Sequence, residues 1–182
     1  MEVSIQLSSP SGLLMVPVRA TLSLTKPLNP EMRELHLNQV QDALRDAAGR
    51  AGIDVWQYRL IPDADACAYD LLVETTPESA AVSQHQGRTF LQAFDEGLAL
   101  RNVEYAAKRS SGRLAPTTLH LMALGWSEAE CRRDFDNGKR EVQHKWAPIG
   151  LAWDDHSRAA VGASFGARRI DLGVVAPMAT AG

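Results

Sequence analysis

An apolar stripe in the middle of the chain is the strongest constraint on its fold. Phe90, Phe94 and Leu98 lie four residues apart, with Leu91 beside them, so the four side chains share one face of a helix. The helical pattern begins after residues 76–78 and continues to about residue 109. A stripe at this spacing is typical of a helix that packs on a sheet, and we interpret it as core rather than as a cofactor site.

Segments with the pattern of β-strands flank this helix. Residues 53–60 and 69–74 are joined by the polar loop 62–65, which predicts an antiparallel hairpin, and residues 117–122 predict a further strand. Alternating apolar residues predict two more strands over residues 3–7 and 16–24. All of these segments are short enough to belong to one sheet.

Two further helices are expected. Asn29 as N-cap and Pro30 at the first helical position open a helix that ends at Gly49 or Gly52. Ser127 and Glu130 form a capping-box pattern, which predicts a helix ending near residue 138. The order is then β-β-α-β-β-α-β-α. It predicts an α+β fold in two layers, with a mostly antiparallel sheet and helices on one face.

The organisation along the chain follows from the same patterns. We expect N-terminal strands within residues 1–28 and a compact domain over residues 29–150. Residues 151–182 are rich in alanine, glycine and arginine, and we expect them to form a loosely ordered tail. The whole chain has 182 residues, the length of one domain.

Composition excludes several classes of function. The net charge of -3 and the isoelectric point near 5.9 provide no basic surface for nucleic acid. No run of apolar residues is long enough to span a membrane, and the N-terminus lacks the pattern of a signal peptide. The two cysteines form neither a disulfide framework nor a metal motif, and the five histidines show no metal-ligand spacing. We therefore expect a cytoplasmic protein without a metal site.

One catalytic motif is present but lacks its usual context. Residues 162–166 match G-x-S-x-G around Ser164, the nucleophile elbow of serine hydrolases. In that fold the acid and the histidine follow the serine, whereas the last histidine of this chain, His156, precedes Ser164. The interpretation favoured by the sequence is a run of small residues in the tail, and not a hydrolase.

A longer pattern carries a family resemblance. Its pieces, in order, are Tyr69-x-Leu71-x-x-Glu74, Phe94, Asn102-x-x-Tyr105-x-x-x-Arg109, Pro116 with Leu119, Gly125-Trp126, and Gln143-x-Lys145 with Pro148. Together they resemble the C-terminal domain of the acyl-acid-amido synthetases, the adenylate-forming enzymes that conjugate auxin or jasmonate to amino acids, and their bacterial relatives.

The resemblance implies roles for particular residues. In that family a large N-terminal domain binds ATP and a carboxylic acid, and the small C-terminal domain rotates over it. Lys145, supported by Gln143, corresponds to the lysine that reaches the active site, and a solvated loop lysine is the alternative. Asn102, Tyr105 and Arg109 fall three and four residues apart on a helix, where we expect a structural role. Trp126 and Trp146 are candidates for an interface, because aromatic side chains are enriched there.

The chain also departs from the family. Lys145 is followed by Trp146-Ala147-Pro148-Ile149, whereas the family places Pro-Arg close after its lysine. The sequence contains no adenylating domain, so we expect at most a component of an adenylate-forming ligase and not a complete enzyme, with ATP and Mg²⁺ implied only through a partner. The leading hypothesis is a small domain that acts in trans with an adenylating partner in amide ligation. The alternative is a non-catalytic module that binds another protein or a second copy of the chain.

Overall fold

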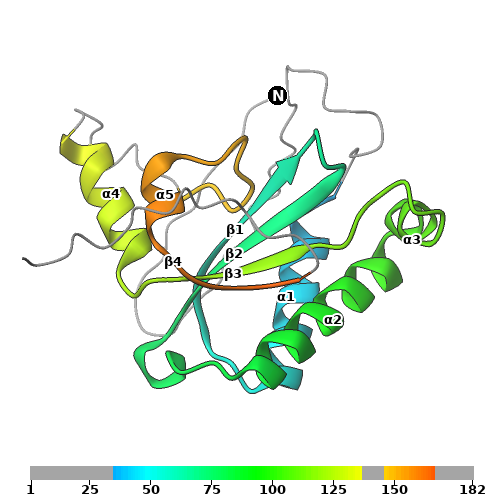
Figure 1. The fold of residues 1–182 in the computed structure, drawn as a ribbon, viewed down its shortest axis with the longest axis horizontal. Helices are drawn as coiled ribbons and strands as arrows, with labels where there is room; N and C mark the ends of the chain where they lie inside the picture. Colours follow the sequence, from blue (N-terminus) through cyan, green and yellow to red (C-terminus); the bar gives the residue numbers. More distant parts are fainter. Residues whose placement is uncertain (1–34, 137–145, 167–182) are drawn as a thin grey trace, which may run out of the picture.

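The computed structural model describes residues 35–136 and 146–166. Its centre is a four-stranded sheet with the order β1 (Val55–Asp63), β2 (Ala68–Thr75), β3 (Thr118–Met122) and β4 (Val161–Phe165). β1 and β2 are antiparallel, β2 and β3 are parallel, and β3 and β4 are antiparallel (Figure 1). The α+β class, the mostly antiparallel sheet and the hairpin predicted from the sequence are confirmed. The predicted strands over residues 3–7 and 16–24 lie outside the described residues.

The connection between the parallel strands β2 and β3 contains two α-helices. It runs through the short 3₁₀ turn η2 (Pro77–Ser79), the long helix α2 (Gln84–Arg101) and α3 (Val103–Ser110). α2 packs against α1 (Leu37–Ala51), and both cover one face of the sheet (Figure 1). The apolar stripe predicted from the sequence forms part of this core, where Phe90, Phe94 and Leu98 are at most 1% exposed.

The other face of the sheet is covered by a smaller hydrophobic cluster. α4 (Trp126–Asp136), α5 (Asp155–Ala159) and the segment 146–153 lie over it (Figure 1). Successive residues of a strand point to opposite faces, so Leu71 and Val73 join the first cluster and Leu72 joins the second. All eight residues of β2 are buried, which explains why this strand contains a continuous apolar run. The expectation of helices on one face therefore describes α1 and α2, and the second face is covered as well.

The helix boundaries differ from the predicted ones for local reasons. α1 begins at Leu37 with His36 as its N-cap, and the predicted start at Asn29 lies outside the described residues. The helical pattern predicted to continue to residue 109 is interrupted at Asn102, which has an extended backbone (φ -140°, ψ 104°). Its side-chain oxygen accepts a hydrogen bond from the Tyr105 amide at 2.9 Å, so Asn102 is the N-cap of α3.

The predicted capping box at Ser127 and Glu130 is wrong. α4 begins one residue earlier, and its first amides are capped by the buried carboxylate of Glu74. The Gly125 and Ser127 amides donate to that carboxylate at 2.6 and 2.9 Å. A negative charge is favourable at this end of a helix because the amide dipoles point toward it. Glu130 instead pairs with Arg59, a contact between residues far apart in the sequence.

The segment expected to be a loosely ordered tail contains regular structure over residues 155–165. α5 and β4 both lie there, and β4 pairs along its length with β3. The sequence of β4 is mostly small residues, and four of its five positions are at least partly exposed, so it lacks the alternation by which strands are recognised. Its pairing with β3 and its one buried residue, Phe165, are tertiary features. Residues 167–182 lie outside the described residues.

All three tyrosines of the chain are buried, and this predicts a pH dependence. Burial raises the pKa of Tyr58 and of Tyr69 to about 12, and burial together with the Asp95 carboxylate raises the pKa of Tyr105 further. Unfolded tyrosine titrates near pH 10. The unfolded chain therefore loses these protons first, and stability falls as the pH rises from about 10 toward 12. Absorbance at 295 nm against pH, with the urea-unfolded chain as control, measures this. Full ionisation near pH 10 in a chain that is still folded would contradict the burial.

Candidate functional site

The segment that follows Lys145 is attached to the edge of the sheet at β1. Gln143 and Lys145 lie outside the described residues, and Trp146 is the next residue in the chain. The Trp146 indole nitrogen donates to the Tyr58 carbonyl at 2.8 Å. The Leu60 amide donates to the Pro148 carbonyl at 2.8 Å, and the Leu60 carbonyl accepts from Gly150 at 2.9 Å. Residues 146–150 therefore have a fixed position beside β1.

Arg59 joins this segment to α4. Its guanidinium group makes two bonds to the Glu130 carboxylate, at 2.9 and 2.7 Å, and its Nε donates to the Ala147 carbonyl at 3.2 Å. The side chains of Arg59 and Glu130 are only 10% and 14% exposed. The guanidinium carbon lies 4.4 Å from the ring centre of Trp146 and 5.5 Å from that of Trp126, which are distances of cation–π contacts. One buried cation thus connects β1, α4 and the segment after Lys145.

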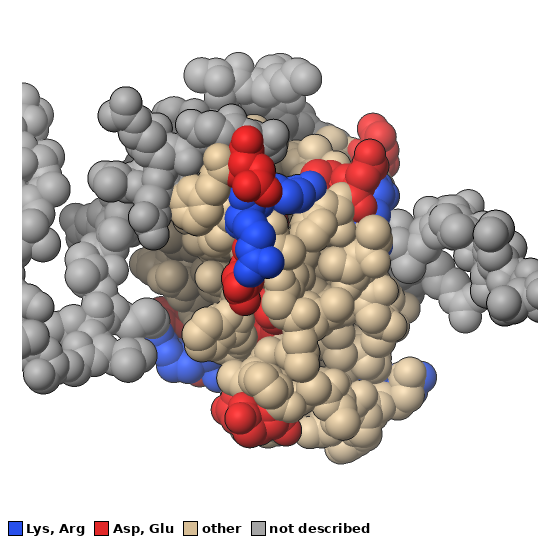
Figure 2. All heavy atoms as spheres, turned by 90° about the vertical axis from the view of Figure 1, so that its left-hand side faces the viewer, with Lys and Arg blue, Asp and Glu red and all other residues tan. Residues whose placement is uncertain are grey.

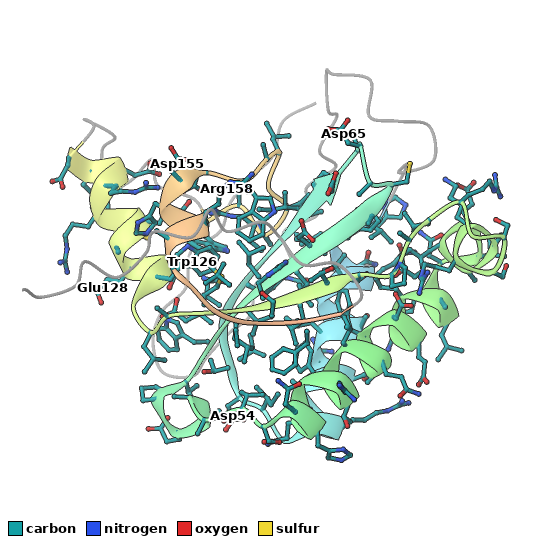
Figure 3. All side chains as sticks on the ribbon, viewed as in Figure 1. Asp54, Asp65, Trp126, Glu128, Asp155 and Arg158 are labelled. Carbon is teal, nitrogen blue, oxygen red and sulfur yellow. The ribbon has the colours of Figure 1, made fainter. Side chains whose placement is uncertain are left out.

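The two tryptophans predicted as interface residues contact each other. Their rings meet edge to face, with centres 5.2 Å apart. Trp126, the first residue of α4, is 2% exposed (Figure 3). Its indole nitrogen donates to the hydroxyl of Ser157 in α5 at 3.1 Å. This position differs from that expected of an interface residue, because Trp126 has almost no exposed surface. Trp146 is half-buried and keeps part of its surface available.

Asp154 fixes the start of α5 beside Trp126. Its carboxylate accepts from the amide and from the hydroxyl of Ser157, at 2.9 and 2.8 Å, and caps α5. Partial burial of this carboxyl group opposes its ionisation, but the hydrogen bonds from Ser157 and the nearby charge of Arg133 outweigh it and lower its pKa. The Ser157 hydroxyl therefore donates to Asp154 and accepts from Trp126, so α5 is fixed against the buried indole.

Asn102, Tyr105 and Arg109 are brought together elsewhere. Tyr105 belongs to the first hydrophobic cluster, whereas Trp126 belongs to the second, so the two groups lie on opposite faces of the sheet. The Tyr105 hydroxyl donates to the Asp95 carboxylate, and Arg109 donates to the same carboxylate at 2.6 and 3.0 Å. Arg109 also donates to the Leu114 carbonyl at 3.0 Å, which holds the loop before β3. These contacts join α2, α3 and the loop before β3, and they lie apart from the segment after Lys145.

The sequence matches the GH3 family C-terminal domain over residues 38–149, which is more than half of the chain and includes the positions of Gln143 and Lys145. The chain belongs to the GH3 family. No curated protein is detectably similar to it in sequence.

Solved structures share the fold of this GH3 C-terminal domain. A structure of the GH3.15 acyl acid amido synthetase matches 76% of the chain with a TM-score of 0.62 and 14% sequence identity. A second, of AtGH3.15 acyl acid amido synthetase in complex with 2,4-DB, matches 79% of the chain with a TM-score of 0.65 and 14% identity. The chain covers 27% of the length of each of these proteins. At this identity the comparison establishes the fold of the domain.

Sequence reasoning missed most of the charged groups that build this GH3 domain. Arg59 and Asp95 have no local pattern that marks them, because each pairs with a side chain on another element. Glu74 belonged to the family pattern, but its role as the cap of α4 had no local signal. The one available signal was burial. Arg59 and Glu74 lie within strands whose neighbours are apolar, and a charged residue there needs a partner.

The surface of the GH3 domain beside α4 is mixed in charge. Figure 2 looks onto this side, where acidic and basic side chains alternate. Arg132 pairs with Glu128 at 2.7 Å, and Arg133 lies 3.6 Å from Asp154. Arg132 and Arg133 therefore each lie beside an acidic side chain on this side of the domain.

Within residues 35–136 and 146–166 no group of three or more His, Cys, Asp or Glu side chains converges as it would around a metal ion. In the same ranges no helix is long and apolar enough to cross a membrane.

Proposed function

We propose that this GH3 C-terminal domain is the small domain of an ATP-dependent acyl-acid-amido synthetase and acts in trans with an adenylating partner in amide ligation. The partner supplies the site for ATP, Mg²⁺ and the carboxylic acid. The family match and the likeness to two synthetase structures support this, since the chain covers only 27% of each. The small domain contributes closure of the site and one cationic side chain.

The observation that carries the proposal is the attachment of Trp146. Lys145 directly precedes a residue whose indole is hydrogen-bonded to Tyr58 and packed against Arg59. Trp146, the residue after Lys145 in the sequence, is thus held against the domain. The ammonium group of Lys145 is a compact charge, which neutralises negative charge that develops on oxygen atoms when the domain closes on its partner.

Loss of Lys145 tests the catalytic part. The tagged full chain is captured from its native lysate together with bound proteins, and pyrophosphate release is measured with ATP and added carboxylic acids. We expect Lys145→Ala to lower the rate by about 100-fold, the effect of removing one group that stabilises transition-state charge. Lys139→Ala, in the same stretch of sequence, is the matched control and is expected to leave the rate unchanged. Equal rates for the two variants would show that Lys145 has no catalytic role.

A second candidate function is a non-catalytic interaction or dimerisation module. The sequence after Lys145 favours it, because the family's Pro-Arg is replaced there and Trp146 packs against the domain's own Arg59. The same capture separates the two functions. A complex without ATP-dependent pyrophosphate release, or a dimer measured by light scattering, would support the module and contradict the ligase component.

A further inference from the structure

A serine, a histidine and an aspartate meet on three neighbouring strands. Ser164 of β4 lies opposite His120 of β3, and Asp70 lies on the adjacent strand β2. The Ser164 hydroxyl oxygen is 2.8 Å from Nδ1 of His120. Nε2 of the same ring is 3.5 Å from Oδ1 of Asp70. That distance is at the outer limit of a hydrogen bond, and Nε2 has no hydrogen-bond partner among the described residues.

The three groups differ in exposure. His120 is fully buried and Asp70 is 3% exposed, whereas Ser164 is exposed at the edge of the sheet. Trp153 covers the two buried members. Its ring meets His120 edge to face at 5.1 Å, and its indole nitrogen donates to Oδ2 of Asp70 at 2.8 Å. Arg158, labelled on α5 in Figure 3, lies 5.4 Å from the Trp153 ring. The base is thus shielded from water, whereas Ser164 lies on the exposed edge strand.

The contact between Nδ1 of His120 and Ser164 is compatible with either tautomer of the ring, and base catalysis requires the one in which Nδ1 accepts. Nδ1 can accept the Ser164 proton only if the ring proton is on Nε2, and this proton then points toward Asp70. The carboxylate stabilises the positive charge that forms when the ring accepts a proton. These are the roles of a Ser-His-Asp triad, here with the two ring nitrogens exchanged relative to the usual form. Catalytic hydrogen bonds are often long in structures without substrate, as the Asp70 contact is.

The chain order no longer excludes a nucleophilic serine. The sequence argument required a histidine after Ser164, as in the nucleophile elbow, but the partner is His120 on a neighbouring strand. The order Asp, His, Ser is that of the subtilisin-type triad, which the nucleophile-elbow argument does not cover.

We propose that Ser164 is a nucleophile toward activated carboxylic esters, with His120 as its general base and Asp70 as the positioning residue. The Ser164 oxygen bonds to the carbonyl carbon, the bond to the leaving alcohol breaks, and the serine proton passes to Nδ1 of His120 and then to the leaving group. Water then bonds to the carbonyl carbon of the acyl-serine and gives its proton to Nδ1 of His120. The bond to the Ser164 oxygen breaks, that oxygen takes the proton back from His120, and the free acid leaves. The contact with His120 supplies a general base for the Ser164 hydroxyl. We therefore expect the substrates to be esters with a good leaving group, such as aryl esters.

Covalent labelling of the intact full chain tests this site. An alkyl fluorophosphonate probe loses fluoride to a nucleophilic serine, and peptide mass spectrometry locates the added group. We expect stoichiometric labelling at Ser164, no labelling of Ser164→Ala, and unchanged labelling of the control Ser110→Ala, which removes an exposed helix hydroxyl. Asp70→Asn is expected to slow labelling by about 10-fold or more, since general-base assistance is worth roughly 10²–10⁴ and the variant weakens it. The unfolding midpoint of each variant, followed by circular dichroism, separates this effect from loss of fold.

Several outcomes would overturn the proposal. Absence of labelling in the folded wild-type chain, labelling at another serine, or equal labelling rates in the folded and the urea-unfolded chain would each show that the contact between Ser164 and His120 is only structural. A burst of p-nitrophenol from p-nitrophenyl acetate, with an amplitude equal to the protein concentration, is the second expected readout. These assays do not involve Lys145 or an adenylating partner, so their failure would leave the proposed function untouched.

Discussion

Replacing Arg59 by alanine is expected to lower the free energy of unfolding by about 3–5 kcal/mol, the usual effect of removing one partner of a buried ion pair. The Glu130 carboxylate, 14% exposed, would then be buried without its cation. The variant also removes the stacking on Trp146 and Trp126 and the bond to the Ala147 carbonyl. Since a domain has only about 5–15 kcal/mol of stability, urea denaturation would show a large shift of the midpoint.

Two controls separate the buried charge from a general effect of losing an arginine. Arg132→Ala removes an arginine whose pairing with Glu128 is exposed, with side chains 70% and 72% accessible, and is expected to change stability by less than about 1 kcal/mol. The double variant Arg59→Met with Glu130→Met removes both charges and is expected to be close to the wild type, since apolar replacements of buried pairs are tolerated. Equal destabilisation by Arg59→Ala and Arg132→Ala would contradict the buried site.

The parts of the fold that depend on local pattern were predictable from the sequence. The Phe90 and Phe94 stripe placed the long helix, because a helix must bury its apolar face. The hairpin of β1 and β2 followed from two short strands and a short loop, and its register pairs Leu60 with Leu71. The start of β3 was placed within one residue of Thr118.

The parts that depend on tertiary pairing were not predictable in this way. Glu130 was interpreted as a local cap, although its partner Arg59 is 71 residues away. Asn102 was placed on a continuous helix, and its extended backbone became evident only with its contacts to Tyr105 and Gln39. A sequence pattern records neighbours along the chain, and these side chains are satisfied by neighbours in space.

Lys145 and the pair of His120 and Ser164 also differ in how far the sequence could predict them. Lys145 was identified by resemblance to the GH3 family, and its role stays a prediction. His120 and Ser164 were both visible in the sequence, but chain order was used to exclude the serine. That argument applies to one fold only, because the same three side chains can converge from any order of elements. The antiparallel pairing of β3 with β4, which brings His120 opposite Ser164, had no sequence signal.

Replacing Phe165 by alanine is expected to destabilise the protein by about 3–5 kcal/mol, the cost of removing a buried aromatic ring. Phe165 is 5% exposed and belongs to the first hydrophobic cluster. A loosely ordered tail over residues 151–182 would instead predict almost no effect. Urea denaturation of the variant, compared with Leu151→Ala at a position 71% exposed, distinguishes the two.

Gly87 provides an independent test of where the Phe165 ring lies. A Cβ atom at Gly87 would be 2.5 Å from that ring, so Gly87→Ala is expected to cost about 1–3 kcal/mol through overpacking. In the Phe165→Ala background the ring is gone, and adding Gly87→Ala is expected to raise stability by up to about 1 kcal/mol, because alanine favours a helix interior. The sign of the effect therefore depends on contact between α2 and β4. The same cost in both backgrounds would mean that the ring does not pack on Gly87 and that β4 is not held against α2.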